Sequence, residues 1–392
     1  MSGTAERDRA IQRMLRAIRE HLGLDVAFVS QFIDGQRLFR YVDAGTGGTG
    51  VEVGQGDPME ESYCHHVVNG SLPRFLSDPR AHPVSAAMRA TAEVGVGTHL
   101  SVPIRFSDGR TYGTFCCFGL GVHDGLADRD AEVLQLLAEL VSEYLEELDA
   151  EERAARARRD RVVRVRRDQQ ALQIVFQPIV ELASDKVTAV EALARFPGAG
   201  SGPQVMFAEA WDVGLGVELE LDAVGAALMH LPELPAGIRL GVNVAPETLV
   251  SDEFLATVDG LPAGRLTVEV TEHAAVEDYD ALKAARQRLS ARGIHLAIDD
   301  VGMGFSGLNH ILECDPDILK IDAAVVRDVH TNPAKAAMIE ALVSFGDRAE
   351  VILVAEGIET AEELRVLREL GVGFGQGYHL ARPGRLDAVL PR

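Results

Sequence analysis

The stretch RLTVEVTEHAAVEDYDALKAARQRLSARGIHLAIDDV (265–301) decides the fold of the larger part of this chain. Two apolar strand-like runs, 265–271 and 295–301, flank a helical stretch over 278–291. A strand, a helix and a second strand in this order form a βαβ unit with parallel strands. The same alternation continues from about residue 170 to the end of the sequence. Repeated units of this kind predict a TIM-type barrel.

Other short apolar runs in this region are also typical of buried strands. They lie at 172–180, 187–196, 238–244, 318–322 and 350–356, with a short one near Phe374–Tyr378. Further helical stretches separate them, for example 333–346 and 360–370. We therefore predict an α/β fold in which residues 169–392 form a (β/α)8 barrel.

Residues 1–150 are predicted to form a smaller α+β domain. Apolar residues recur at helical spacing within 6–20, and strand-like runs follow at 24–32, 99–106 and 111–119. The Asp-Gly pair of SDGR (107–110) predicts a hairpin between the last two runs. A small sheet capped by helices in this way has room for a ligand pocket.

Residues 126–168 contain no glycine or proline, so we predict one long connector helix between the two domains. Its apolar residues alternate at steps of three and four, as in an a/d heptad seam: Leu134, Leu137, Val141, Tyr144 and Leu148. The pattern fits either an amphipathic helix packed on its own domain or a dimeric connector that transmits a signal. We expect the second, in a homodimer.

The composition limits the kinds of partner. Asp and Glu outnumber Lys and Arg by 60 to 38 in the 392 residues, which gives a net charge of −22. This excess argues against binding of a nucleic-acid polymer, which needs a basic surface. The four cysteines form no CxxC motif, and no run of 18 apolar residues or secretory signal is present. We expect a cytoplasmic protein that is not embedded in a membrane.

Polar side chains interrupt the predicted barrel strands near their carboxyl ends, where barrel enzymes place their active sites. These residues are Glu191, Asn243, Glu269, Asp299, Asp300, Lys320, Glu356 and Gln376. The alternation of each strand turns Asn243 and Glu269 towards the barrel lumen. One acid at a strand end is usually a helix cap or a surface residue, but five acids at one face predict a site.

Five neighbouring carboxylates repel one another and take up protons unless cations neutralise them. Oxygen ligands favour Mg²⁺ or Mn²⁺ over zinc, and the adjacent pair Asp299 and Asp300 can ligate two metals, with Asp299 as the bridge. Such a pair of metals is suited to in-line hydrolysis of a phosphodiester, with a nearby lysine that helps to hold the attacking hydroxide.

The motifs around these residues resemble a known family. Glu191-Ala192-Leu193 resembles the signature of the EAL-domain cyclic di-GMP phosphodiesterases, over about residues 169–392. Further motifs follow in family order: QPIV (177–180), NVAP (243–246), EVTE (269–272), DDVG (299–302), LKID (319–322), AEGIET (355–360) and QGY (376–378). The resemblance implies hydrolysis of cyclic di-GMP to the linear dinucleotide pGpG, with two divalent cations.

The resemblance also implies a role for each matching residue. It implies a first metal held by Glu191, Asn243, Glu269 and Asp299, and a second held by Asp299 and Asp300. Lys320 matches the lysine at the catalytic water, Glu356 a general base, Gln376 a glutamine near water and substrate, and Glu272 the glutamate that holds the loop after Asp300. Gln177, Leu193 and Arg195 resemble substrate contacts, with Arg195 towards a phosphate.

The loop after the aspartate pair departs from the family pattern. It usually reads DDFGTGYSSL, whereas this chain has DDVGMGFSGL, with Val301, Met303, Phe305 and Gly307 at the changed positions. In the family this loop organises the second metal and the dimer contact. The departures leave open an alternative function, a receptor that binds cyclic di-GMP with little or no hydrolysis.

The segments SYCHHVVNGSLPRFLSDPR (62–80) and GVGTHLSVPIRFSDGRTYGTFCCFG (95–119) resemble a GAF sensory domain, over about residues 8–150. Domains of this family bind cyclic nucleotides, bilins, haem or nothing, so the resemblance implies regulation by an unidentified small molecule or by a pocket that is only structural. The Cys64-His65 pair is consistent with a bilin site, but we expect Cys64 to be a buried core residue.

Overall fold

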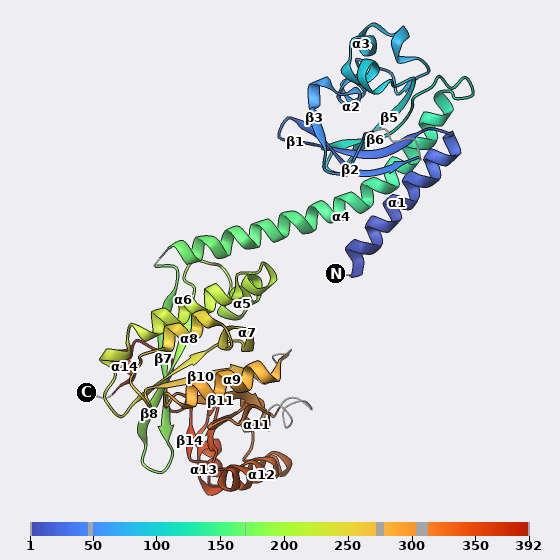
Figure 1. Ribbon diagram of the computed structural model, residues 1–392. Helices are drawn as coiled ribbons and strands as arrows, with labels where there is room; N and C mark the ends of the chain where they lie inside the picture. The colour runs from blue at the N-terminus through green and yellow to red at the C-terminus, as the bar shows by residue number, and fades with distance from the viewer. Residues whose placement is uncertain (1, 46–49, 169, 272–277, 303–312, 391–392) are drawn as a thin grey trace. The chain divides into compact units, whose positions relative to one another are not determined.

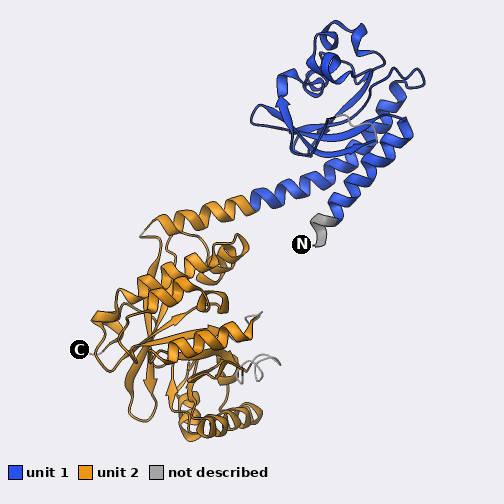
Figure 2. Cartoon of the chain, in the orientation of Figure 1, with its two compact units in different colours: residues 1–154 blue, residues 155–392 orange. Residues whose placement is uncertain are grey.

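The computed structural model describes residues 2–45, 50–168, 170–271, 278–302 and 313–390 (Figure 1). The chain divides into two compact units, residues 1–154 and 155–392 (Figure 2). The exact limits of the functional domains stay a prediction. None of the helices in the described ranges combines the length and apolar character needed to cross a membrane.

The first unit is built on an antiparallel sheet of six strands in the order β3-β2-β1-β6-β5-β4. The strands are β1 (Val26–Ile33), β2 (Gln36–Ala44), β3 (Gly56–Pro58), β4 (Phe75–Leu76), β5 (Thr98–Arg105) and β6 (Thr111–Gly119). The hairpin predicted at SDGR is confirmed, because β5 and β6 pair on either side of it. The strand β2 was not predicted, because the charged residues Arg37, Arg40 and Asp43 interrupt its apolar pattern.

Helices cover both faces of this sheet. On one face lie α1 (Ser2–Leu22) and the first part of α4 (Asp128–Arg167), and on the other lie α2 (Tyr63–Val68) and α3 (Pro83–Ala86) (Figure 1). Successive residues of β6 serve opposite faces, since Cys117 belongs to the core beneath α1 and α4 and Cys116 to the core beside α2. The expectation that Cys64 is a buried core residue is confirmed.

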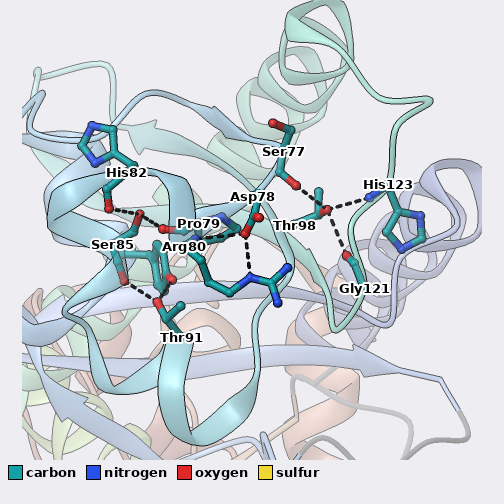
Figure 3. Close-up of polar contacts among 11 residues, drawn as sticks. Ser77, Asp78, Pro79, Arg80, His82, Ser85, Thr91, Thr98, Gly121 and His123 are labelled. Carbon is teal, nitrogen blue, oxygen red and sulfur yellow. Dashed lines mark hydrogen bonds and ion pairs between the residues drawn. The ribbon is translucent and has the colours of Figure 1, made fainter.

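Side chains fix the irregular connection between β4 and β5 (Figure 3). The Thr98 hydroxyl donates to the carbonyls of Ser77 (3.1 Å) and Gly121 (3.0 Å) and accepts from the backbone N–H of His123. The Ser85 hydroxyl donates to the Pro79 carbonyl at 2.6 Å. These bonds satisfy backbone groups that have no ladder partner, which holds the turns around α3 and the segment after β6 in a defined shape.

The helix α4 extends from Asp128 to Arg167 without a break, as the absence of glycine and proline predicts. The apolar residues of its heptad seam are not left exposed for a second helix. Leu134 and Val141 are buried in the core of the first unit, and Leu137, Tyr144 and Leu148 pack against that core. The amphipathic interpretation therefore describes this seam better than the dimeric one, and the homodimer stays a prediction.

The second unit is a closed eight-stranded barrel in the order β10-β11-β12-β13-β14-β7-β8-β9. Its strands are β7 (Gln173–Glu181), β8 (Lys186–Arg195), β9 (Arg239–Asn243), β10 (Leu266–Thr271), β11 (His295–Val301), β12 (Ile318–Ile321), β13 (Ile352–Ala355) and β14 (Phe374–Gly375). The predicted TIM-type barrel is confirmed, with one departure from the regular form. The strand β7 runs antiparallel to both neighbours. Only residues 182–185 connect β7 to β8, and a parallel crossover needs a much longer connection.

Helices surround the barrel, and most follow a strand. They are α5 (Pro203–Asp212), α6 (Gly216–Leu228), α7 (Pro246–Leu249), α8 (Asp252–Val258), α9 (Tyr279–Ser290), α11 (Ala323–Val326), α12 (Pro333–Ala349), α13 (Ala361–Glu369) and α14 (Leu386–Val389). Outward-facing strand residues such as Val242, Val268 and Ile298 form the core beneath these helices. The remaining strand positions face the lumen, where the polar residues gather.

Candidate functional site

Lys320 lies at the centre of the carboxylates at one end of the barrel. Its ammonium group is 2.5 Å from Glu269, 2.6 Å from Glu356, 3.3 Å from Asp299 and 3.4 Å from Glu191. The four acids come from β10, β11, β8 and the residue after β13, so the barrel closure brings them together. Lys320 is 1% exposed, and among the described residues these four acids are its ion-pair partners.

A glycine on a neighbouring strand makes room for the Glu269 carboxylate. A Cβ atom at Gly241 would lie 2.2 Å from its Oε1 atom. The absence of a side chain on β9 therefore lets Glu269 reach into the lumen towards Lys320.

Glu191 also accepts hydrogen bonds from two side-chain amides. Its Oε1 atom accepts from the Asn243 side-chain amide at 2.7 Å, and its Oε2 atom accepts from Gln376 at 2.7 Å. The Gln376 amide also donates to the Gln177 oxygen at 3.1 Å, and Gln177 donates to the Ala381 carbonyl at 3.2 Å. The oxygen Oε1 of Gln376 is buried and has no protein partner among the described residues. It is free to accept a bond from a water or a ligand.

The surroundings of Glu191 and Glu269 shift the pKa values of these two acids in opposite directions. Burial favours the neutral form of both acids. For Glu191 the Lys320 charge and the amide donors outweigh burial, so its pKa is lowered. For Glu269 burial and the nearby charges of Glu191 and Asp299 outweigh Lys320 and raise its pKa to about 8. The cluster thus holds more negative groups than one lysine can neutralise.

Two further acids of the cluster, Glu356 and Asp300, also have raised pKa values. Burial, together with Asp299 and Glu191, raises the pKa of Glu356. Burial and the adjacent Asp299 raise the pKa of Asp300 to about 6. Asp300 has a φ of +59°, a left-handed conformation that aspartate tolerates better than most residues.

Three of these acids meet the geometric requirement for a cation. Each of Asp299, Asp300 and Glu356 offers an oxygen, and the three oxygens lie within 4.8 Å of one another. Hard oxygen donors and unneutralised negative charge are what Mg²⁺ and Mn²⁺ favour. The residues therefore fit a divalent cation. Asn243, by contrast, presents its amide nitrogen to Glu191, so ligation by its oxygen needs a rotated amide.

A cleft of about 480 Å³ opens beside the cluster. Its lining includes the polar residues Glu191, Asn243, Asp299 and Asp300. Leu193 and Arg195 also line it, and the Arg195 guanidinium donates to the Ala194 carbonyl at 2.8 Å. Further lining residues are Phe207, Trp211 and Glu220. These three residues were not predicted from the sequence, although Trp211 is the single tryptophan of the chain.

The structure brings nearly all the predicted site residues into this region. Eight of them contact one another around Lys320 and Glu191: Gln177, Glu191, Asn243, Glu269, Asp299, Lys320, Glu356 and Gln376. Glu272 lies outside the described residues, as do Met303, Phe305 and Gly307 of the altered loop. The remaining altered residue, Val301, is buried at the end of β11.

The first unit has a separate cavity of about 370 Å³ on the α2 side of its sheet. Its lining includes the buried residues Arg37 and His99 and the rings of Phe28 and Phe39. The guanidinium of Arg37 bonds to Asp57 at 2.8 Å and lies over the Phe39 ring at 4.4 Å. The cavity provides the ligand pocket expected of a small helix-capped sheet, without identifying an occupant.

Comparison with known families accounts for both units. Residues 159–383 match the EAL domain, and residues 4–146 match the GAF domain. The EAL match covers more than half of the 392 residues. The resemblances drawn from the sequence motifs are therefore confirmed.

Curated relatives have names that concern cyclic di-GMP. The chain is 32% identical over 243 residues to the probable cyclic di-GMP phosphodiesterase PdeN of Escherichia coli (strain K12), covering 58% of this chain and 46% of the relative. It is 31% identical over 284 residues to the cyclic di-GMP phosphodiesterase NbdA of Pseudomonas aeruginosa, covering 69% of this chain and 35% of the relative. The chain thus spans less than half the length of these two relatives.

Solved structures support the same fold. The PaMucR phosphodiesterase in complex with c-di-GMP has a TM-score of 0.53 and 28% identity, over 58% of this chain and 98% of that one. The EAL enzyme Bd1971 in its cAMP-bound form also has a TM-score of 0.53, with 17% identity over 93% of this chain and 92% of that one. The second likeness shows the fold alone.

Proposed function

Because this chain belongs to the EAL-domain family through residues 159–383, we propose that it is a phosphodiesterase that hydrolyses cyclic di-GMP to linear pGpG. The observation that carries the proposal is the cluster of Glu191, Glu269, Asp299 and Glu356 around Lys320 at the mouth of the barrel. The names of PdeN and NbdA support the choice of substrate.

The proposed reaction depends on two divalent cations, Mg²⁺ or Mn²⁺. Asp299 and Asp300 would hold one, with Glu356 close enough to take part, and Glu191, Asn243, Glu269 and Asp299 would hold the other. When bound, such ions lower the pKa of water and neutralise charge on the phosphate. The acidic excess around Lys320 supports this assignment, since added positive charge would lower the raised pKa values of the cluster.

The residues of the chain have complementary roles in this proposal. Lys320 holds the reacting water by donation from its ammonium group, and Glu356, 2.6 Å from that group, accepts the proton as general base. The unpartnered oxygen of Gln376 accepts a bond from water or substrate. Gln177, Leu193 and Arg195 contact the substrate in this proposal, and Leu193 and Arg195 line the cleft beside the acids.

The alternative is a receptor that binds cyclic di-GMP with little or no hydrolysis. The feature that favours it is the altered sequence DDVGMGFSGL, in which Val301 replaces the phenylalanine of the family pattern. The complete set of acids and the lysine favour the enzyme.

We further propose that the GAF domain regulates the barrel through α4, with a small molecule in the cavity beside Arg37 as the signal. The continuity of α4 supports this, since residues of one helix contribute to the cores of both units. The homodimer also remains a proposal, and light scattering at micromolar concentration tests it. A monomeric mass there would contradict it.

The experiment that tests the proposed reaction is chromatography of the products formed by the full chain from cyclic di-GMP with Mg²⁺, with Mn²⁺ and with a chelator. The enzyme predicts metal-dependent appearance of pGpG. The receptor predicts bound cyclic di-GMP in equilibrium dialysis and no pGpG under any condition. The variant Lys320→Ala, checked for folding by circular dichroism, is the control for a contaminating hydrolase.

A further inference from the structure

The cleft beside the acidic cluster is lined by aromatic rings as well as by carboxylates. Phe207 and Trp211, both on α5, line the cleft that also contains Asn243 and Asp299. A cleft that combines a carboxylate cluster suited to a divalent cation with flat aromatic rings is complementary to a nucleotide. A nucleotide has a phosphate that a cation can bind and a planar base that can stack on a ring.

Hydrogen bonds fix the Trp211 ring relative to the strand that carries Asn243. The indole N–H donates to Glu220 Oε1 at 3.1 Å, and Glu220 Oε2 accepts from the backbone N–H of Ala245 at 2.8 Å. Ala245 follows Asn243 by two residues. The Glu220 carboxylate is buried, so one side chain ties the indole to the strand end that carries Asn243.

Close packing restrains both aromatic rings. A Cβ atom at Gly216 would lie 2.2 Å from Cδ2 and 2.5 Å from Cε2 of Trp211, so only glycine lets α6 approach the indole this closely. Phe207 packs edge-to-face on Phe196, with 5.5 Å between the ring centroids. The rings are therefore held in place before any ligand arrives, which reduces the entropy lost on binding.

We propose that Trp211 is the stacking wall for one purine base of the cyclic dinucleotide, and that Glu220 is the residue that positions this wall. The inference rests on the proposed function, because it places the scissile phosphate at the acidic cluster. Stacking of bases on aromatic side chains is a general mode of recognition for unpaired nucleotides. Trp211 would then contribute to binding, and Glu220 would act through Trp211 without touching the base.

The single tryptophan permits a direct test. The emission of the full chain is recorded while cyclic di-GMP is added in the presence of a chelator, and equilibrium dialysis measures binding in the same buffer. Stacking predicts saturable quenching of the emission with a midpoint equal to the dialysis dissociation constant. Binding by dialysis with unchanged emission would contradict the inference and leave the proposed function intact.

Kinetics of variants provide a second readout. Trp211→Ala is expected to raise KM roughly five- to hundredfold with kcat within about threefold, because stacking is present before and during the reaction. Trp211→Phe, which keeps an aromatic face, is the matched control and is expected to recover most of the loss. A merely structural role of Trp211 predicts lowered kcat and lowered thermal stability in both variants. This result would refute the proposal that Trp211 stacks on a purine base. If the full chain neither binds nor hydrolyses cyclic di-GMP, the proposed function fails and this inference fails with it.

Discussion

Lys320 and Glu269 form an ion pair of 2.5 Å inside the barrel, where each residue is about 1% exposed. Their strands, β12 and β10, are separated by β11, so the two side chains meet inside the lumen and not between adjacent strands. Burial of a single ion pair often contributes little to stability, because the loss of hydration offsets the attraction. This lysine is different, since Glu191, Asp299 and Glu356 also lie within 3.4 Å of it. It is the main neutralising charge of the cluster.

Replacement of Lys320 by methionine is expected to destabilise the barrel by about 3–5 kcal/mol in a chelator, because the buried acids lose their partner. Addition of Mn²⁺ is expected to restore more stability to this variant than to the wild type. Urea unfolding with and without the cation measures both effects.

The matched control for Lys320 is Lys283→Met, which removes an exposed lysine paired with Glu313. Such a surface pair contributes at most about 1 kcal/mol, and no dependence on Mn²⁺ is expected. Equal stability of Lys320→Met and wild type in chelator would show that the acids are neutralised in some other way.

Glu191→Gln is expected to reduce the formation of pGpG by about a hundredfold or more, because Glu191 links Asn243 and Gln376 and is a proposed ligand. Product chromatography measures the loss, and circular dichroism checks the fold. Glu181→Gln, at the turn end of the same β7–β8 hairpin, is expected to keep wild-type turnover. Retained activity in Glu191→Gln would remove this residue from the proposed machinery.

The sequence was sufficient to predict most of the barrel, because its strands are short apolar runs with polar residues at fixed positions. It was not sufficient for the direction of β7. This strand runs antiparallel to β8 and β14, although its residues are as apolar as those of the other barrel strands. The information lies in the connection over 182–185, whose shortness requires a hairpin. The strand β2 was missed because arginines at positions 37 and 40 interrupt its apolar pattern, and Arg37 is buried only through contacts made by the folded chain.

For the site, two features of the sequence were enough to predict that the acids lie together: their positions near strand ends and the alternation of side chains along each strand. These features do not predict how many contacts one side chain makes. Lys320 reaches four acids because the barrel closes, which is a property of the whole fold. Trp211 and Glu220 were missed because they lie on helices, where an isolated aromatic or acidic residue has no distinctive pattern. The single tryptophan in the composition was the available signal.

The pH dependence of stability is expected to reveal Glu363, at the start of α13. Its carboxylate accepts from the backbone N–H groups of Asp328, Glu359 and Thr360 at 2.9–3.0 Å. Burial opposes ionisation, but these donors outweigh it and lower the pKa of Glu363. The contribution to stability is therefore complete above the ordinary glutamate pKa and is lost as pH falls through the lowered value.

Glu363→Gln is accordingly expected to cost about 1.5–3 kcal/mol at neutral pH, and less under acid conditions. Urea unfolding of variant and wild type at several pH values measures this difference. Glu362→Gln, an exposed neighbour in the same turn, is expected to change stability by less than about 0.5 kcal/mol at every pH. A cost for Glu363→Gln that does not vary with pH would contradict the assigned role.

The thiol of Cys64 is expected to ionise well below its ordinary pKa. Burial favours the neutral thiol, but a hydrogen bond with Cys116, at a sulfur separation of 3.4 Å, and the charge of Arg37 lower the pKa of Cys64 to about 5. Burial raises the pKa of Cys117 far above its usual range and that of Cys314 to about 11, so neither thiol titrates in the same range. The ultraviolet absorbance of thiolate should therefore be present at neutral pH and disappear as pH falls through about 5.

The linked stability has a definite sign. Because the pKa of Cys64 is lower in the folded chain than in the unfolded chain, its contribution is complete above the ordinary thiol pKa and is lost as pH falls through about 5. Cys64→Ser should abolish the thiolate absorbance, and Arg37→Met should shift its titration to higher pH, because the guanidinium 3.4 Å from the sulfur is then missing. Cys314→Ser should leave the titration unchanged. If the wild type shows no absorbance change between acid and neutral pH, Cys64 is an ordinary neutral thiol. Arg37 then pairs with Asp57 without lowering the pKa of Cys64.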